Sequence, residues 1–233
     1  MSQNTPHNPL TNEAAPKRSR RKEARPGELL EAALDLFVEK GFAATRVDDV
    51  AARAGVSKGT LFLYFPSNEE LFDALVREHI VGRFTVWNNS LESFVGNTSA
   101  VFTYFYQVWW DRIGVTKADG ITKLMFSEAQ NFPEIAQFYQ QEVILPGRAL
   151  IRRILQRGME RGEFRQMDLE YGTYIVLAPM MFLMLWNNSM GPCSLPDEVF
   201  TPEQYIRTQI DNILHGLCVR PAAGATPPPS QNP

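Results

Sequence analysis

Apolar side chains recur three or four residues apart through much of this chain, a spacing typical of one face of an α-helix. The first such run covers residues 28–40, and Gly41 supplies its stop. Later runs begin at two predicted capping boxes, Ser67–Glu70 and Thr201–Gln204. The last run carries an apolar stripe that consists of Ile206, Ile210, Ile213, Leu214 and Leu217. The pattern predicts an all-α protein with about nine helices.

Residues 47–65 predict two short helices joined by a tight turn, which is the form of a DNA-binding helix-turn-helix. Ala51 and Ala54 are small enough for a second helix to cross them closely, and Gly55 supplies the left-handed conformation that ends a helix. Ser57 is a natural N-cap for the second helix. The first turn of that helix, which would face the DNA bases, contains Lys58, Gly59 and Thr60. The alternative is an ordinary helical hairpin.

A run of basic residues precedes the first predicted helix. Its members are Lys17, Arg18, Arg20, Arg21, Lys22 and Arg25. A flexible cationic arm of this kind can enter a minor groove or displace counterions from phosphates, with Arg20 and Arg21 as the candidate contacts. The alternative is a solvated tail. The whole-chain charge of -3 does not argue against DNA, because residues 17–64 hold ten Lys or Arg against seven Asp or Glu.

The N-terminal third resembles the TetR family of bacterial transcriptional regulators. The motifs that carry the resemblance are Gly41–Thr45, Ala51–Leu61, Tyr64–Phe65 and Glu69–Leu71, within a stretch from about Arg25 to His79. The resemblance implies a three-helix DNA-binding domain, a fourth helix that links it to an all-α ligand and dimerisation domain, and a homodimer on a palindromic operator. By position, it implies DNA contact for Thr45, Arg46, Ser57, Lys58, Thr60 and Tyr64. Thr45 also lies where it can cap the second helix.

Two positions depart from the pattern of the family. Phe62 stands where the family usually has a tyrosine whose hydroxyl meets a phosphate, and Asn68 stands where it usually has a lysine. Both changes remove expected phosphate contacts. The basic arm before the first helix is a candidate for replacing them.

We divide the chain into a disordered basic arm at residues 1–24, a DNA-binding domain at 25–70, a ligand-binding and dimerisation domain at 71–219, and a disordered tail at 220–233. Residues 174–186 form an uncharged segment of thirteen residues, shorter than the ~20 needed to cross a membrane. A helix that is apolar on all faces is buried on all faces. We therefore expect no membrane contact, and a homodimer through the last two helices. The alternative is a purely intramolecular core.

Aromatic and methionine side chains gather between the DNA-binding domain and the last helices, where they suit a pocket for a flat or amphiphilic organic effector. The candidate lining residues are Phe102, Phe105, Trp109, Phe126, Tyr139 and Met181. Ligand in this pocket would shift the fourth helix, residues 67–90, and move the two DNA-binding heads of the dimer out of register. The alternative is a filled core in an architectural or protein-responsive DNA binder without a small-molecule effector.

The sequence offers no catalytic machinery. The three histidines, His7, His79 and His215, have neither metal nor triad spacing, and no phosphate-binding loop, nucleophile elbow or dinucleotide fingerprint occurs. We therefore expect no enzyme activity, no cofactor and no metal. Cys193 and Cys218 make no disulfide framework, which favours the cytoplasm. Residues 126–134 and 157–164 are similar to regulatory domains of AcrR-like members of the TetR family.

Overall fold

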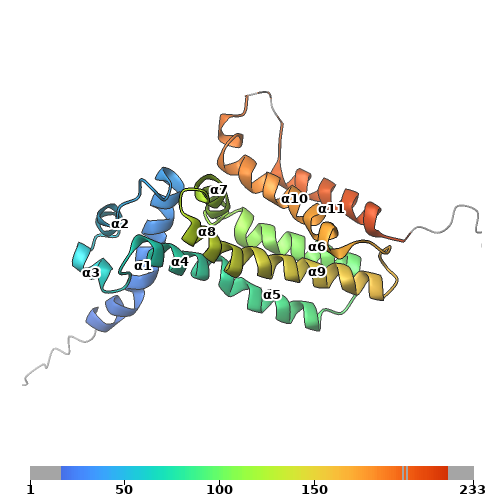
Figure 1. The fold of residues 1–233 in the computed structure, drawn as a ribbon, viewed down its shortest axis with the longest axis horizontal. Coiled ribbons are helices and arrows are strands. Elements are labelled where there is room, and N and C mark those ends of the chain that lie inside the picture. Colours follow the sequence, from blue (N-terminus) through green and yellow to red (C-terminus); the bar gives the residue numbers. More distant parts are fainter. Residues whose placement is uncertain (1–16, 196, 198, 220–233) are drawn as a thin grey trace, which may run out of the picture.

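The computed structural model describes residues 17–195, 197 and 199–219, with the side chains of residues 17–25 left out (Figure 1). The described residues form α-helices without a β-sheet, and an isolated bridge joins Phe164 to Cys218. Two π-helical turns, η1 and η3, join neighbouring α-helices without a break. The eleven α-helices of the described part therefore form nine continuous helical segments, as the sequence predicts.

The N-terminal end of the molecule consists of α1 (Lys17–Lys40), α2 (Val47–Arg53) and α3 (Lys58–Phe62). We expected an unstructured arm before residue 25, but α1 already begins at Lys17. Lysine, arginine, glutamate and alanine fill most of residues 17–25, and these are good helix formers, so the helix extends towards the N-terminus. Residues 1–16 and 220–233 lie outside the described residues, so the predictions of disorder there stay predictions.

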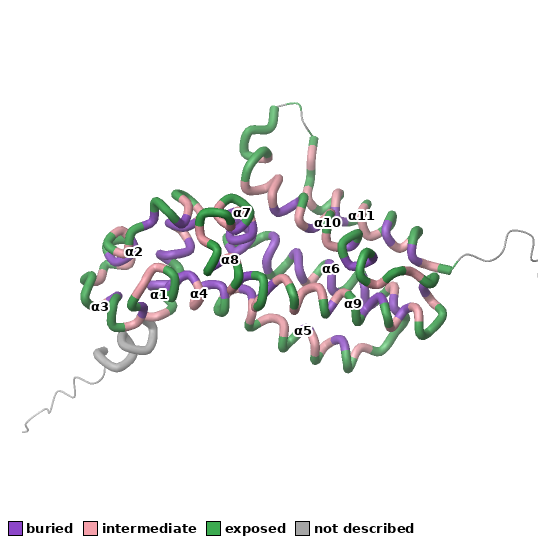
Figure 2. The backbone as a smooth tube through the Cα atoms, viewed as in Figure 1, coloured by how far each residue is buried: buried purple, intermediate pink, exposed green. Residues whose placement is uncertain are grey.

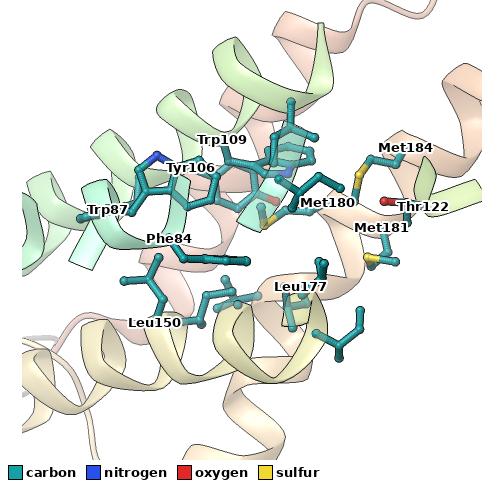
Figure 3. Close-up of a pocket in the computed structure, with 18 of the residues that line it drawn as sticks. Phe84, Trp87, Tyr106, Trp109, Thr122, Leu150, Leu177, Met180, Met181 and Met184 are labelled. Carbon is teal, nitrogen blue, oxygen red and sulfur yellow. The ribbon is translucent and has the colours of Figure 1, made fainter. Parts of the chain in front are cut away.

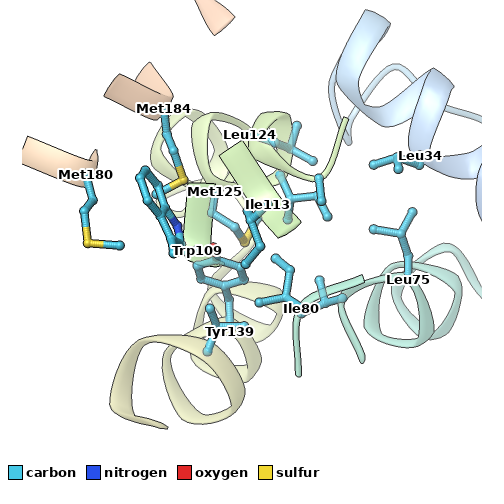
Figure 4. Packing of buried hydrophobic residues seen from close by; sticks show 14 of the residues in the cluster. Leu34, Leu75, Ile80, Trp109, Ile113, Leu124, Met125, Tyr139, Met180 and Met184 are labelled. Atoms are coloured by element: carbon cyan, nitrogen blue, oxygen red, sulfur yellow. The ribbon is translucent and has the colours of Figure 1, made fainter. Parts of the chain in front are cut away.

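Four phenylalanine rings join the first helices to the rest of the protein. Phe37 stacks on Phe42 with 5.4 Å between ring centroids, and Phe72 meets both rings edge-on at 5.7 Å. Phe132, from the segment before α8, packs against Phe42 at 4.7 Å. Figure 4 shows the buried residues running on from Leu34 and Leu75 into the larger domain. The two predicted domains therefore share one continuous hydrophobic core.

The predicted fourth helix is present but bends through a π-helical turn. It consists of α4 (Asn68–Val76), η1 (Arg77–Val81) and α5 (Gly82–Ser93). The predicted cap is confirmed, because the Ser67 side chain accepts a hydrogen bond from the Glu70 backbone N–H at 3.1 Å. One helical unit thus runs from the N-terminal helices along the side of the larger domain (Figure 1).

The larger domain continues with α6 (Thr98–Trp109), η2 (Trp110–Gly114) and α7 (Asp119–Glu128). The next helical unit consists of α8 (Pro133–Tyr139), η3 (Gln140–Ile144) and α9 (Leu145–Glu160). The π-turn η3 has a local cause: Pro146 lacks an N–H, so the Glu142 carbonyl loses its usual partner and the α-helical ladder is interrupted.

The chain ends in α10 (Leu169–Asn188), a short 3-10 turn (Gly191–Cys193) and α11 (Pro202–Leu217). Helices α7, α9 and α11 all pack against α10. The predicted capping bond at Thr201 does not form, although proline does occupy the first turn of α11. Figure 2 shows exposed, intermediate and buried residues alternating along both helices.

Helix α10 has the length and the composition of a membrane span, which the thirteen uncharged residues alone did not indicate. It covers 20 residues because the helix extends N-terminally to Leu169 and C-terminally to Asn188. The other helices of the bundle bury Val176, Met180 and Leu183 on its inner side. Helix α10 therefore packs on the bundle with one side, and its other side is exposed, so the expectation of burial on all faces is wrong for the single chain.

Candidate DNA-binding surface and ligand cavity

The helix-turn-helix has the predicted local geometry. Gly55 adopts φ +66°, a left-handed conformation that favours glycine, and ends α2. Ser57 caps α3, because its side chain accepts the Thr60 backbone N–H at 3.1 Å. Val50 and Leu61 are fully buried beneath the two helices. This arrangement holds the first turn of α3 outward, where Lys58 and Gly59 are exposed and Thr60 is half-buried.

Lys58 is the cation at the tip of this surface. Its Nζ lies 2.8 Å from Asp48 Oδ1 on α2 and 5.8 Å from the centroid of the Phe62 ring. An exposed ion pair of this kind contributes about 0–1 kcal/mol, so a DNA phosphate can displace Asp48 at little cost. Phe62 is itself partly exposed, and it supports Lys58 where the family pattern has a tyrosine hydroxyl.

Thr45 does not have the role that we expected. Its side chain is 3% exposed, and its hydroxyl lies 2.7 Å from the Gly41 carbonyl and 3.1 Å from the Leu36 carbonyl. The N-cap of α2 is Arg46, without a side-chain capping bond. Because the Thr45 hydroxyl is directed into the domain, Thr45 holds the end of α1 against the loop before α2 and cannot present its side chain to DNA.

The remaining predicted DNA contacts differ in position. Arg46 is exposed beside α2, whereas Tyr64 is half-buried and packs against the core with its ring 6.5 Å from that of Phe65. Arg20 and Arg21 lie on α1, but their side chains are outside the described part of the structure. Asn68 donates from Nδ2 to the Thr45 carbonyl at 3.2 Å, so it fixes the start of α4 to the helix-turn-helix.

A cavity of about 140 Å³ lies within the larger domain (Figure 3). Its walls come from α5, α6, α7, α9 and α10, together with the π-turns and α8. The lining residues are Ile80, Phe84, Trp87, Phe102, Phe105, Tyr106, Trp109, Ile113, Thr122, Tyr139, Val143, Ile144, Gly147, Leu150, Ile151, Ile154, Val176, Leu177, Met180, Met181 and Met184. No Asp, Glu, Lys, Arg or His among the described residues belongs to this lining.

Five of the six residues expected in the pocket line this cavity, and Phe126 does not. Phe126 is 61% exposed, because it lies on the outer face of α7, whereas Leu124 and Met125 on the inner face are buried. The walls that α5 and α9 contribute, such as Trp87 and Leu150, were not predicted from the sequence. The amphipathic pattern of α9 marks its inner face, but no local pattern tells a cavity wall from a filled core.

Three π-helical turns border the cavity. Ile80 comes from η1, Ile113 from η2, and Val143 and Ile144 from η3. A π-turn widens the helix locally and shifts side chains out of the regular α-helical register, and such turns are frequent at functional sites. Their gathering around one cavity supports a binding role for it.

Polar groups are few in the cavity wall. The Thr122 and Tyr139 hydroxyl oxygens lie 3.0 Å apart and bond to each other. Burial raises the pKa of Tyr139 to about 12, so its hydroxyl stays protonated at neutral pH. The Tyr106 hydroxyl also faces a buried environment, which raises its pKa. The cavity therefore suits an uncharged, mainly apolar ligand.

Ion pairs cross from the larger domain to the helix-turn-helix. Lys117, just before α7, binds Asp35 on α1, and Asp35 lies 3.6 Å from Arg53 on α2. Arg53 also pairs with Glu39 at 3.0 Å, and this pairing holds the pKa of the Glu39 carboxyl below its usual range. Together with the Phe42–Phe132 contact, this chain of ion pairs joins α7 and α8 directly to α1 and α2.

A buried carboxyl lies at the same junction. Asp119 begins α7, and its Oδ2 accepts hydrogen bonds from Asn188 at 2.8 Å and Asn187 at 3.3 Å, both from the end of α10. Its Oδ1 is buried without a partner among the described residues. Burial raises the pKa of Asp119 to about 7, although the two asparagine bonds act in the opposite direction.

Comparison with known families gives two matches. Residues 29–75 match the family of bacterial regulatory proteins described as the tetR family, and residues 109–199 match a tetracyclin repressor-like C-terminal domain. The first match covers the helix-turn-helix and most of α4, and the second covers the region from the end of α6 to the loop after α10.

Two relatives extend the match beyond single domains. The chain is 25% identical over 193 residues to the uncharacterized HTH-type transcriptional regulator YdeS of Bacillus subtilis. The matched region covers 81% of this chain and 87% of YdeS. It is 30% identical over 152 residues to the HTH-type transcriptional repressor KstR2 of Mycobacterium tuberculosis. This matched region covers 64% of this chain and 74% of KstR2.

A solved structure shares the fold. A protein from Saccharomonospora viridis, described as a transcriptional regulator and solved in complex with choline, superposes with a TM-score of 0.69 at 18% identity. The match covers 85% of this chain and all of that one. Helix-turn-helix and larger domain therefore occur together in the same arrangement in other proteins.

Proposed function

This chain belongs to the TetR family of bacterial transcriptional regulators, and we propose that it represses transcription from a palindromic operator until a small apolar or aromatic effector releases it. One observation carries the effector part of the proposal: the domain behind the helix-turn-helix holds an apolar cavity bordered by three π-turns. A filled core at this place would instead favour an architectural or protein-responsive factor. We place this function in the cytoplasm, where bacterial DNA is found.

We propose that the protein acts as a homodimer through α10 and α11. Large apolar side chains are exposed on α10, namely Tyr171, Tyr174, Ile175 and Phe182. On α11, by contrast, Ile206, Ile213 and Leu217 are buried within the chain, so the stripe expected to face a partner packs mainly inward. Helix α10 therefore contributes most of the proposed contact, and α11 contributes its partly exposed residues. A dimer places two recognition helices on two half-sites, which a monomer cannot do.

The helical unit α4–η1–α5 offers a route from effector to DNA. At one end, Asn68 binds the Thr45 carbonyl beside α2. Further along, Ile80 and Phe84 line the cavity. An effector that displaces these side chains moves the unit and changes the separation of the two recognition helices from the ~34–36 Å that operator half-sites require. The effector shifts this equilibrium by its differential affinity for the two states, typically ~1–3 kcal/mol.

The proposed function is tested with the DNA upstream of the chain's own gene. Fluorescence anisotropy, with an excess of unrelated duplex as competitor, should show tight binding of two subunits to a palindrome. A screen of neutral apolar compounds against this complex should then find release. Binding that any competitor removes equally would contradict operator recognition. Specific binding that no compound affects would favour the factor without a small-molecule effector.

Lys58→Ala should weaken operator binding by about fivefold to tenfold and reduce the slope of log affinity against log salt by about one. The reason is that Lys58 stands exposed at the start of α3 and exchanges Asp48 for a phosphate. Asp48→Asn should act in the opposite direction, because it frees Lys58 and removes a negative charge from the DNA side. Anisotropy titrations at several salt concentrations measure both effects.

The matched control is Arg112→Ala, which removes one exposed cation from the larger domain. It should leave operator affinity within twofold of the wild type. Equal effects of Lys58→Ala and Arg112→Ala would mean that net charge, rather than contact by α3, governs binding.

A further inference from the structure

One hydroxyl in the cavity wall lacks a partner. Tyr106 is 3% exposed, and its Oη is buried without a hydrogen-bond partner among the described residues. Its ring lies beside the Trp109 indole, with 5.9 Å between the ring centroids (Figure 3). Seven buried polar side chains in the described part of the chain have an atom without a partner, and Tyr106 is the one that lines the cavity.

The other side-chain hydroxyls of the wall are already used, because Thr122 and Tyr139 bond to each other. Leaving a buried hydroxyl unsatisfied is costly, and natural proteins retain such groups chiefly where a ligand or water completes them. Burial keeps the pKa of Tyr106 above its ordinary value, so the group is a protonated donor at neutral pH. What it lacks is an acceptor.

We propose that the effector is an uncharged, largely apolar molecule that carries one hydrogen-bond acceptor, such as a carbonyl oxygen, and that Tyr106 donates its hydroxyl proton to that atom. This inference rests on the proposed ligand-responsive function and names the chemical class of its effector. The apolar body of the effector would contact the aromatic and methionine side chains, while Tyr106 would set its orientation.

The charge of the lining favours a neutral effector. An anion would meet no basic side chain among the described lining residues, and a cation would meet no carboxylate. Aromatic rings such as those of Trp87 and Phe105 attract cations, but the loss of water from a permanent charge opposes its burial without a counter-charge. A neutral molecule with an acceptor avoids this loss of hydration and also accepts a hydrogen bond from the Tyr106 hydroxyl.

The size of the cavity sets the size of the probe. Its volume of about 140 Å³ is close to that of an engineered apolar cavity of about 150 Å³ that binds benzene in another protein. Single-ring molecules are therefore suitable probes. Acetophenone and α-methylstyrene form a matched pair, because they have nearly the same shape and differ in carrying C=O or C=CH₂.

The experiment measures binding of both probes to the full chain without DNA, by isothermal titration calorimetry. Tyr106→Phe should weaken acetophenone binding by about fivefold to tenfold and change α-methylstyrene binding by less than twofold. The control is Tyr139→Phe, which removes a lining hydroxyl that already has a partner. It should not discriminate between the two probes.

Several results would overturn the inference. These are equal effects of Tyr106→Phe on both probes, tighter binding of phenyltrimethylammonium or benzoate than of acetophenone, and failure of both neutral probes to bind. Thermal unfolding checks the fold of the variant, and Tyr106→Phe should not lower the Tm, because it removes an unsatisfied group.

Two further results distinguish a failure of the proposed function from a failure of the inference about Tyr106. If acetophenone binds in a Tyr106-dependent manner but operator DNA stays bound in an anisotropy assay, the effector class is supported and release by such an effector is contradicted. If release occurs with no dependence on Tyr106, the response is supported and the inference about Tyr106 is overturned.

Discussion

Replacing Ile175 by glutamate should convert the proposed dimer into a monomer and lower its affinity for a palindromic operator by about 100-fold or more. Ile175 is 62% exposed, although it lies in the middle of a long apolar helix. Its neighbours on the same outward side, Tyr171 and Phe182, are also exposed. Such a patch of large apolar residues is typical of a contact surface.

The size of this effect has two sources. A two-fold axis places the substituted residue in the interface twice, so two carboxylates would lose water against apolar surface. Loss of the dimer then separates the two recognition helices, and linked binding of two half-sites exceeds binding of one by about 10²–10⁴. Ile175→Glu should leave folding intact, because its side chain is not part of the buried core.

Analytical ultracentrifugation would measure the association state, and anisotropy would measure operator affinity. The control is Val95→Glu, which adds the same charge at a residue that is 95% exposed in the loop between α5 and α6. It should remain dimeric and bind the operator normally. A dimeric Ile175→Glu protein with unchanged affinity would place the subunit contact away from this side of α10.

Asp119→Asn should stabilise the protein by roughly 2–4 kcal/mol at pH 8 and by about 1 kcal/mol or less near pH 4.5. Burial raises the pKa of Asp119 from 3.8 to about 7 in the folded state. Charging this carboxyl at high pH is therefore unfavourable in the folded protein. Asparagine keeps an oxygen that accepts the bonds from Asn187 and Asn188 without the charge.

The sign of the pH dependence follows from proton binding. Below about pH 3.8 both folded and unfolded chains hold the Asp119 proton, so the carboxyl does not affect stability. Between pH 3.8 and about 7 the folded chain binds more protons than the unfolded chain, so its contribution to stability falls as the pH rises. Above about pH 7 the cost is complete and constant.

Denaturant unfolding of the wild type and of Asp119→Asn, from pH 4.5 to pH 8.5, measures the difference in their free energies of unfolding. Asp111→Asn is the matched control, because Asp111 is exposed on η2 and loses the same charge. An equal pH-dependent change in both variants would mean that the loss of a negative charge, and not the burial of Asp119, causes the effect. If the difference in free energy of unfolding between Asp119→Asn and the wild type stays constant with pH, ionisation of Asp119 does not destabilise the folded protein.

Local patterns were sufficient to predict the helix-turn-helix. Gly55 ends α2 and Ser57 caps α3 because glycine conformation and side-chain capping act within one helical turn. The apolar spacing also indicated which side of these helices is buried, as Val50 and Leu61 confirm. The start of α1 was missed, because the basic composition of residues 17–25 pointed to a free arm while its helix propensity pointed to a helix.

Contacts between distant residues were not readable from these patterns. Thr45 matches a DNA-contact position in the sequence, but the carbonyls of Leu36 in α1 and of Gly41 just after it draw its hydroxyl inward. Phe126 belongs to the same aromatic run as residues of the cavity wall, but it lies on the outer face of α7, away from the core. In both cases the packing of the surrounding elements determines where the side chain points.

Helix type, the caps of α3 and α4 and the buried faces of the helix-turn-helix thus follow from the chain itself, since they depend on residues one or two turns apart. The cavity, the unpartnered Tyr106 hydroxyl and the raised pKa of Asp119 depend on how α6, α7 and α10 pack together. The same aromatic helix would fill a core or line a cavity according to the volume left between its neighbours. That volume is a property of several helices at once, and it is absent from any single stretch of sequence.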